Sequence, residues 1–171
     1  MTATTGRRAV AVGRWVVDPD RSTAGFAVGN LGFRTVHGVV PIVGGTVEVA
    51  DDGQPRMIRA ELDLAAVTTG NRRRDADLRK PHLLDLDAHP RLVFEADAFE
   101  AGPQGWRAMG QLSARGTSCP LPVLGVPASA GDELHLVGTA VLDRTALGIR
   151  APRLLIGRRV SIVVDTWLTQ A

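Results

Sequence analysis

Apolar and polar residues alternate along most of this chain. In the segment 105–116, every second residue from Trp106 to Ala114 is apolar or glycine, and most of the residues between them are polar. The same period of two recurs in the segments 56–67, 91–99, 133–144 and 159–168. Successive side chains of a β-strand point to opposite faces, so this pattern predicts half-buried antiparallel strands.

Short polar segments separate these strands and predict hairpin turns. They are DDGQP at 51–55, AGPQG at 101–105, RGTS at 115–118 and SAGDE at 129–133. Two earlier segments, 22–28 and 35–50, add further strands. The second is interrupted by Pro41 and by the pair Gly44-Gly45, which predicts a bend or a bulge in a strongly curved sheet.

One charged stretch breaks the alternation. From Asn71 to Lys80 no period of two is present, and the segment predicts a short helix with Asn71 as its N-cap and Pro81 as its stop. Because this helix joins two strands, we expect it over one opening or edge of the sheet. The whole pattern predicts an all-β protein: a single antiparallel up-and-down barrel of about eight strands, spanning 14–169 behind a tail of 1–13.

The inward faces of the predicted strands are rich in small residues. These are Ala60, Ala96, Ala98, Ala108, Gly110, Gly138 and Ala140. A small barrel that is filled by its own side chains needs bulk inside, so the pattern suits an apolar space that an elongated apolar ligand fills. Alternatively, glycine and alanine accommodate the curvature of the barrel and neighbouring bulky groups. Periodicity alone leaves both interpretations open.

Composition indicates an ordinary globular protein. Of its 171 residues, 44% are hydrophobic and 22% charged, and the formal net charge is only +2. Aromatic residues make up 4%, so we expect no nucleic-acid partner. The lone Cys119 excludes an intrachain disulfide and is expected to be buried and inert. The first residues contain no long apolar run, so we expect no signal peptide, no membrane span and a cytoplasmic protein.

A search for chemistry finds no catalytic constellation. The four histidines lack metal-ligand spacing, and no serine lies in a G-x-S-x-G elbow, so we expect no catalytic residue, no metal and no cofactor. Asp75 and Asp77 are flanked by arginines that would hold them ionised, which indicates local ion pairs rather than general acids. Asp143 and Arg144 are expected to form a brace at the barrel rim.

Several motifs, taken together in this order, resemble the YceI-like family of polyisoprenoid-binding proteins. They are WVVDPDRSTAGFAV, RTVHGVV, RRRDADLRKPHLLDLDAHPRLVFEAD, GQLSARGTSCPLPV, LDRTALGI and IGRRVSIVV, and they cover the chain from about Trp15 to Leu168. The resemblance implies a lipocalin-like antiparallel barrel with a hydrophobic cavity. It also implies isoprenoid or similar long-chain amphiphiles as ligands.

The sequence departs from this family pattern at several positions. Arg21, Asn30 and Asp77 stand where the family often has histidine. Val40 and Leu147 replace two aromatic residues. The glycines, turns and apolar alternation that specify the fold persist. The departures therefore concern the polar contacts to a ligand's head group.

The leading hypothesis is a noncatalytic carrier that transports or sequesters a long apolar amphiphile, such as an isoprenoid quinone or a polyprenyl phosphate. The alternatives are an enzyme that acts on a lipid-like substrate in the same cavity and a ligand-free structural or interaction domain. A homodimer stays open. The residues predicted to line the cavity are Phe26, Val28, Ala60, Leu62, Leu64, Phe94, Ala96, Ala108, Gly110, Leu112, Ala140 and Leu142.

Overall fold

The chain forms one antiparallel sheet that closes on itself. A computed structural model describes residues 10–30, 33–150 and 156–171. The strands within these residues are β1 (Gly13–Val17), β2 (Thr23–Asn30), β3 (Arg34–Val49), β4 (Pro55–Asp63), β5 (Arg91–Ala101), β6 (Trp106–Ala114), β7 (Thr117–Ala130), β8 (Glu133–Asp143) and β9 (Ile156–Gln170). The helix α1 (Arg72–Leu78) and the 3-10 turns η1 (Pro19–Arg21), η2 (Leu64–Ala66) and η3 (Arg144–Leu147) connect them.

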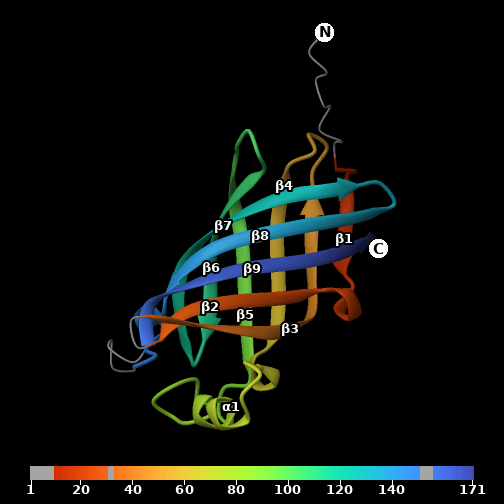
Figure 1. Cartoon of the computed structure of the whole chain (residues 1–171). Coiled ribbons are helices and arrows are strands. Elements are labelled where there is room, and N and C mark those ends of the chain that lie inside the picture. Colours follow the sequence, from red (N-terminus) through yellow and green to blue (C-terminus); the bar gives the residue numbers. More distant parts are fainter. Residues whose placement is uncertain (1–9, 31–32, 151–155) are drawn as a thin grey trace.

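Eight of these strands make the barrel. Hydrogen-bonded neighbours follow the order β3-β2-β9-β8-β7-β6-β5-β4, and pairing of β3 with β4 closes the ring. The short β1 is added at the rim, where it pairs with both β3 and β9. In Figure 1, β8, β9 and β2 run across the view in front of the upright strands β4 and β5. The prediction of an all-β antiparallel barrel with one short helix is confirmed, with β1 as an additional strand.

Strand β3 serves two walls of the barrel. Its first half pairs with β2 from Arg34 to Pro41, and its second half pairs with β4 from Ile42 to Val49. The register shifts between Ile42 and Gly44, at the position where the sequence predicts a bend or bulge. The interruption therefore lets one continuous strand turn a corner between the two walls.

A bulge in β5 changes the phase of that strand. Ala96 pairs with Gly110, but Ala98 pairs with Met109, so Asp97 is the extra residue. Ala96 is buried and Ala98 is exposed. The prediction that Ala98 continues the inward face is therefore wrong, because one inserted residue reverses which side chains point inward.

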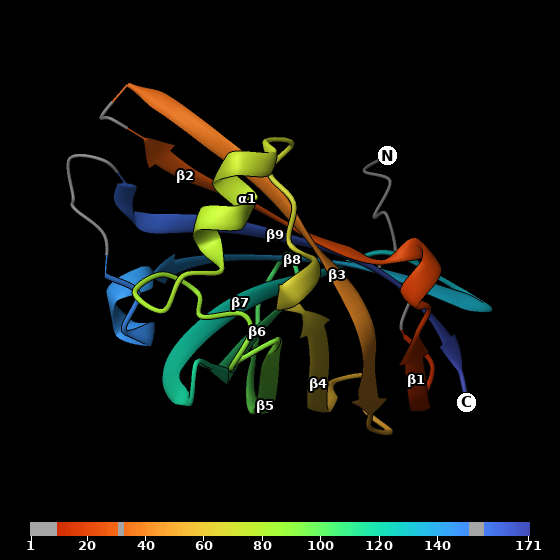
Figure 2. The ribbon, with the colours of Figure 1, turned by 90° about the horizontal axis from the view of Figure 1, so that it is seen from below.

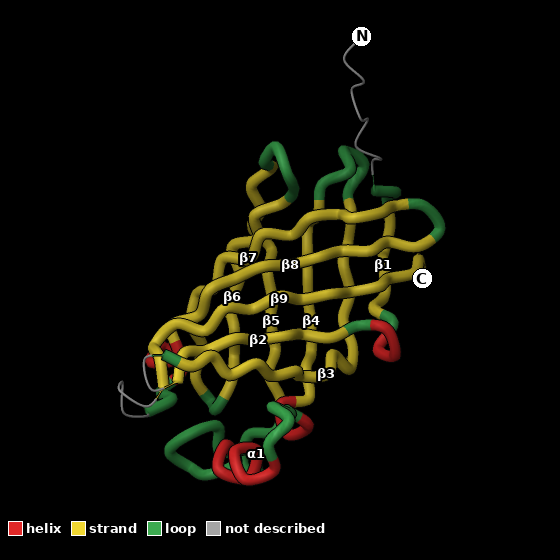
Figure 3. The backbone as a smooth tube through the Cα atoms, in the orientation of Figure 1, coloured by secondary structure: helices red, strands yellow, loops and turns green. Residues whose placement is uncertain are grey.

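Helix α1 lies across one end of the barrel. Figure 2 views the molecule from that end, and Figure 3 shows the helix below the strands. The Asn71 side chain caps it by accepting a hydrogen bond from the backbone N–H of Arg74 at 3.0 Å, as predicted. The Asp75 carboxylate ties the helix back to Thr69, from which it accepts bonds from the backbone N–H at 3.0 Å and from Oγ1 at 2.6 Å. In the part of the chain that the structure describes, no helix has the length and apolar character needed to cross a membrane.

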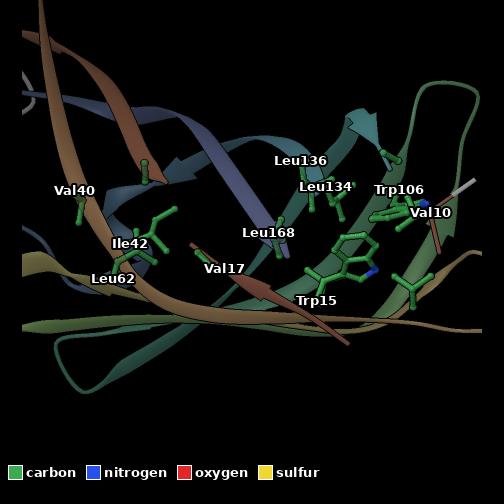
Figure 4. Close-up of a cluster of buried hydrophobic side chains, with 14 of the residues drawn as sticks. Val10, Trp15, Val17, Val40, Ile42, Leu62, Trp106, Leu134, Leu136 and Leu168 are labelled. Atoms are coloured by element: carbon green, nitrogen blue, oxygen red, sulfur yellow. The ribbon is translucent and has the colours of Figure 1, made fainter. Parts of the chain in front are cut away.

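The other end of the barrel is packed solid. Trp15, Leu134 and Leu168 are completely buried there, and Trp106 joins them, as Figure 4 shows. Val10 is also buried in this cluster, although it belongs to the segment 1–13 that the sequence assigns to a tail. Residues 1–9 of that segment lie outside the described residues. These large side chains close this end of the barrel within the residues that the structure describes.

Candidate ligand-binding cavity

The barrel encloses an apolar cavity of about 1090 Å³. Every strand contributes to its wall, and the connection that contains α1 borders one end. The volume lies just above the usual range for ligand-binding pockets, roughly 300–1,000 Å³. Arg73 lines the cavity and is exposed, so the cavity reaches the surface beside α1. The interior therefore has one blind apolar end and one polar mouth.

Most of the residues predicted from the sequence lie in this wall. Those that line the cavity are Phe26, Val28, Ala60, Leu62, Leu64, Phe94, Ala108, Leu112, Ala140 and Leu142. Ala96 and Gly110 do not line it. A Cβ atom built on Gly110 would overlap the Phe94 ring, so that ring covers the glycine and separates it from the interior.

Phe26 and Phe94 lie against the wall in the same way. The Phe26 ring covers Gly38, its direct partner on β3, and the Phe94 ring covers Gly110 on β6. A ring can occupy the space above a glycine because no Cβ is there. Both aromatic side chains therefore cover backbone instead of projecting across the cavity, which leaves the interior wide.

The mouth carries charged side chains that the predicted lining did not include. Arg73, Arg74 and Asp77 of α1 line the cavity. Neither guanidinium forms a hydrogen bond or salt bridge within the described residues. Arg73 and Asp77 are four residues apart, which puts both on one face of a helix. This spacing is the feature of the sequence that could have indicated a shared position for them. It could not show which way that face points, because the tertiary placement of α1 decides it.

Asp77 stays ionised at this mouth. A hydrogen bond from Lys80, with Nζ 2.9 Å from Oδ1, and the Lys80 charge lower the pKa of the Asp77 carboxyl below its usual value. A carboxylate that is held ionised is a poor general acid. The arrangement suits charge-based positioning of a polar group better than proton transfer.

Buried and half-buried arginines hold the connections around the mouth together. The Arg144 guanidinium donates hydrogen bonds to the backbone carbonyls of Ile149, Ile156 and Gly157 at 2.8, 3.0 and 2.9 Å. Arg115 donates to the carbonyls of Leu147 and Pro81 at 3.0 and 2.8 Å. Both side chains cross-link separate connecting segments, so the rim around the cavity is a braced structure.

The predicted rim brace has different partners from those expected. Asp143 accepts hydrogen bonds from Arg158 at 2.6 Å and from Thr145, and these lower its pKa, with the Thr145 hydroxyl as the largest cause. Arg144 instead turns to backbone carbonyls. Asp143 and Arg144 therefore do not pair with each other: Asp143 pairs with Arg158, and Arg144 binds backbone carbonyls.

Other reactive groups lie away from the cavity or are inactivated by burial. Cys119 is buried, and desolvation raises the pKa of its thiol, which opposes nucleophilic use. His135 lies on the outer face, where Nε2 is 2.6 Å from Asp165 Oδ1 and the ring stacks on Trp167. Among the described residues, no three His, Cys, Asp or Glu side chains gather as a metal site.

Arg21, Asn30 and Asp77 stand where the YceI-like family often has histidine, and the structure does not bring them together as one site. Arg21 does not line the cavity, because its guanidinium pairs with Asp18 and Glu133 at 2.9 and 2.6 Å. Asp77 borders the mouth. The side chain of Asn30 lies outside the described part of the structure. Of the two whose side chains the structure describes, Asp77 and not Arg21 is placed to alter contacts with a bound molecule.

Comparison with known proteins gives a consistent picture. A model of the YceI-like domain matches residues 15–168. BcnA of Burkholderia cenocepacia has a similar structure, with a TM-score of 0.77 and 16% identity over 88% of this chain and 98% of its own. A polyisoprenoid-binding domain from Saccharophagus degradans gives 0.73 and 11% identity over 92% and 98%. The Campylobacter jejuni YceI protein gives 0.68 and 11% over 74% and 80%. No curated protein shows significant sequence similarity to the chain.

Proposed function

We propose, from the premise that this chain belongs to the YceI-like family, that it carries or sequesters a long-chain apolar amphiphile in its barrel cavity. One observation carries the proposal: an apolar cavity of about 1090 Å³ is closed at one end and has most of its charged lining residues at the other. Burying each CH₂ group of a ligand contributes roughly 0.8 kcal/mol, so a long tail binds without specific polar contacts.

The ligand that we propose is an isoprenoid quinone, a polyprenyl phosphate or a similar lipid. The shape of the cavity supports a long tail inside, with the head group at the mouth beside Arg73 and Arg74. The similar Saccharophagus degradans structure is described as a polyisoprenoid-binding domain, which supports the isoprenoid class for this chain. The proposed binding unit is the barrel of residues 14–169, and the proposed compartment is the cytoplasm.

An enzyme that acts on a lipid-like substrate in the same cavity is the second candidate. The observation in its favour is that an ionisable carboxyl, Asp77, lines the cavity. Against it, the hydrogen bond from Lys80 holds Asp77 ionised, and His135 and Cys119 do not line the cavity. We therefore assign the cavity a binding role. A ligand-free structural domain, the third candidate, would not need the hollow interior.

Native mass spectrometry of the purified protein, before and after extraction with organic solvent, tests the function. We expect an extractable mass in the lipid range and a return of the bound state when a fluorescent isoprenoid or fatty-acyl probe is added. A protein that carries no lipid and takes up neither probe would contradict the carrier function. Chemical conversion of the probe during incubation would favour the enzyme instead.

A further inference from the structure

The charged residues that the structure describes are unevenly distributed over the barrel. We define the mouth end as the described residues 29–30, 33–36, 63–91, 113–118, 143–150 and 156–159. Hydrogen bonds join the connections that follow β4, β6 and β8 around the cavity mouth: Arg150 N donates to His82 O at 3.2 Å, and Arg115 reaches both Pro81 and Leu147. These connections lie at the α1 end of the barrel in Figures 1 and 2.

Among the described residues, the mouth end is basic and the remainder is acidic. Of the described residues, the mouth end has twelve Arg or Lys against six Asp or Glu. The remaining described residues have five Arg or Lys against twelve Asp or Glu. A formal net charge of +2 for the chain therefore hides a strong charge asymmetry between the mouth end and the other described residues. Such an asymmetry attracts an anionic surface to the mouth end and repels it from the acidic remainder.

An exposed aromatic side chain lies at the same end. Phe33, between β2 and β3, is 77% exposed, the largest exposed fraction among the large apolar side chains that the structure describes. The Arg34 guanidinium lies over its ring, 5.6 Å from the centroid. An aromatic residue beside basic residues is the composition of surfaces that enter the boundary between lipid head groups and acyl chains.

We propose that the mouth end docks on the surface of an anionic lipid bilayer, with Phe33 in the interface and the arginines against the lipid phosphates. The docking itself is inferred from the basic residues and Phe33. The idea that docking serves to load the cavity rests on the proposed function. A lipid that leaves a bilayer at this end enters the barrel without exposing its tail to water. The acidic remainder of the barrel orients the protein for this transfer.

A polyanion such as DNA shares the phosphate chemistry. The bilayer is favoured because the basic surface surrounds the mouth of an apolar cavity and includes an exposed phenylalanine. Neither feature serves a duplex, whose phosphates need only positive charge. DNA binding is therefore treated as a competing outcome of the experiment.

Vesicle flotation with the full chain tests the docking. We use vesicles of phosphatidylcholine alone and of phosphatidylcholine with 30% phosphatidylglycerol. We expect binding to the anionic vesicles, little binding to the neutral ones, and loss of binding in 0.5 M salt, since attraction between exposed charges is screened. Equal binding to both vesicle types, or none to either, overturns the proposal.

Matched variants locate the docking surface. The double variant Arg72→Glu with Arg159→Glu changes exposed mouth-end residues outside the cavity lining and should weaken binding more than about tenfold. The control, Arg56→Glu with Arg107→Glu, makes the same charge change at exposed positions elsewhere and should leave it within about twofold. Phe33→Ser should also weaken binding, whereas Val141→Ser, at a position that is 59% exposed, should not. Equal losses in test and control variants would overturn the assignment.

Two further measurements separate this inference from the proposed function. Uptake of the isoprenoid probe from detergent, without vesicles, should be unchanged in the Arg72→Glu/Arg159→Glu variant. If the wild type takes up the probe but does not float, only the docking is wrong; if it floats but takes up no probe, only the carrier function is wrong. Stronger binding to duplex DNA than to anionic vesicles at equal salt would overturn docking in favour of a nucleic-acid partner.

Discussion

Gly38 and Gly110 are each covered by a phenylalanine ring from the neighbouring strand, Phe26 and Phe94 respectively. At residue scale these two pairs control the width of the cavity. A glycine in an inward-facing position suggests empty space when only the sequence is considered. In the folded protein the phenylalanine ring occupies the space where a Cβ atom would otherwise lie. A bulky substitution at Gly110 therefore tests this ring packing rather than the cavity.

The variant Gly38→Ala should narrow the cavity. Its Cβ would overlap the Phe26 ring, which must rotate away from the wall and into the interior. We expect weaker binding of a long-chain probe and a loss of about 1 kcal/mol in the free energy of unfolding, the typical energy of a displaced rotamer. Probe titration and chemical denaturation measure the two effects.

The matched control is Gly44→Ala, on the same strand, where an added Cβ would meet no atom within 4 Å. It should bind the probe normally. Gly110→Ala should be more destabilising than Gly38→Ala, because its Cβ would also lie 2.9 Å from the Glu95 carbonyl oxygen. If Gly38→Ala and Gly44→Ala bind the probe equally, the rings do not limit the width.

At the scale of elements, the sequence predicts features that neighbouring residues determine better than features that depend on the packing of distant segments. The N-cap Asn71 and the stop before Pro81 are local, so the extent of α1 could be predicted. The bulge after Ala96 depends on pairing with β6, and the alternation alone gave no sign of it. For the same reason the sequence could not show that Arg73 and Arg74 border the cavity, since this follows from how α1 packs on the barrel.

The aspartate that anchors α1 should control exchange of the bound molecule. In Asp75→Ala, the Thr69 N–H and hydroxyl lose their acceptor, which loosens the start of the helix over the mouth. We expect faster release of a bound probe and a loss of about 1 kcal/mol in stability. Stopped-flow release and hydrogen exchange of residues 68–80 provide the measurements.

The control for this variant is Asp52→Ala, which removes an aspartate that accepts a bond from the Gln54 N–H in a turn at the opposite end. It should release the probe at the wild-type rate. Equal release rates in wild type and Asp75→Ala would show that α1 does not gate the mouth.

The connection before β9 should depend on Arg144. Arg144 is 3% exposed, and its guanidinium holds three backbone carbonyls at once, a geometry that the lysine ammonium cannot reproduce. We expect Arg144→Lys to lower the free energy of unfolding by on the order of 3 kcal/mol. In contrast, Arg158→Lys, in an exposed pair with Asp143, should lower it by less than about 1 kcal/mol. Denaturant titration compares them, and similar losses would contradict the bracing role.

At the scale of the whole molecule, the barrel is asymmetric along its length. Trp15, Leu134 and Leu168 fill one end, whereas the interior toward α1 is open. The alternation of residues predicted the closed sheet because barrel strands must have one apolar face. It could not distinguish a packed interior from a hollow one, because both use the same inward positions. The structure distinguishes a packed interior from a hollow one, because it shows that the large side chains gather at one end.

Two alanines on adjacent strands decide experimentally whether the interior is hollow. Ala108 lines the cavity, whereas Ala96 is buried without lining it. A phenylalanine at position 108 has space to occupy, so Ala108→Phe should keep its thermal stability in the ligand-free form and lose binding of an isoprenoid or fatty-acyl probe. Ala96→Phe has no such space and should lose about 1–3 kcal/mol, the usual effect of overpacking a core. Thermal and denaturant unfolding with probe titration give both readouts. If both variants unfold alike and the wild type takes up no probe, the barrel is solid and the carrier function is wrong.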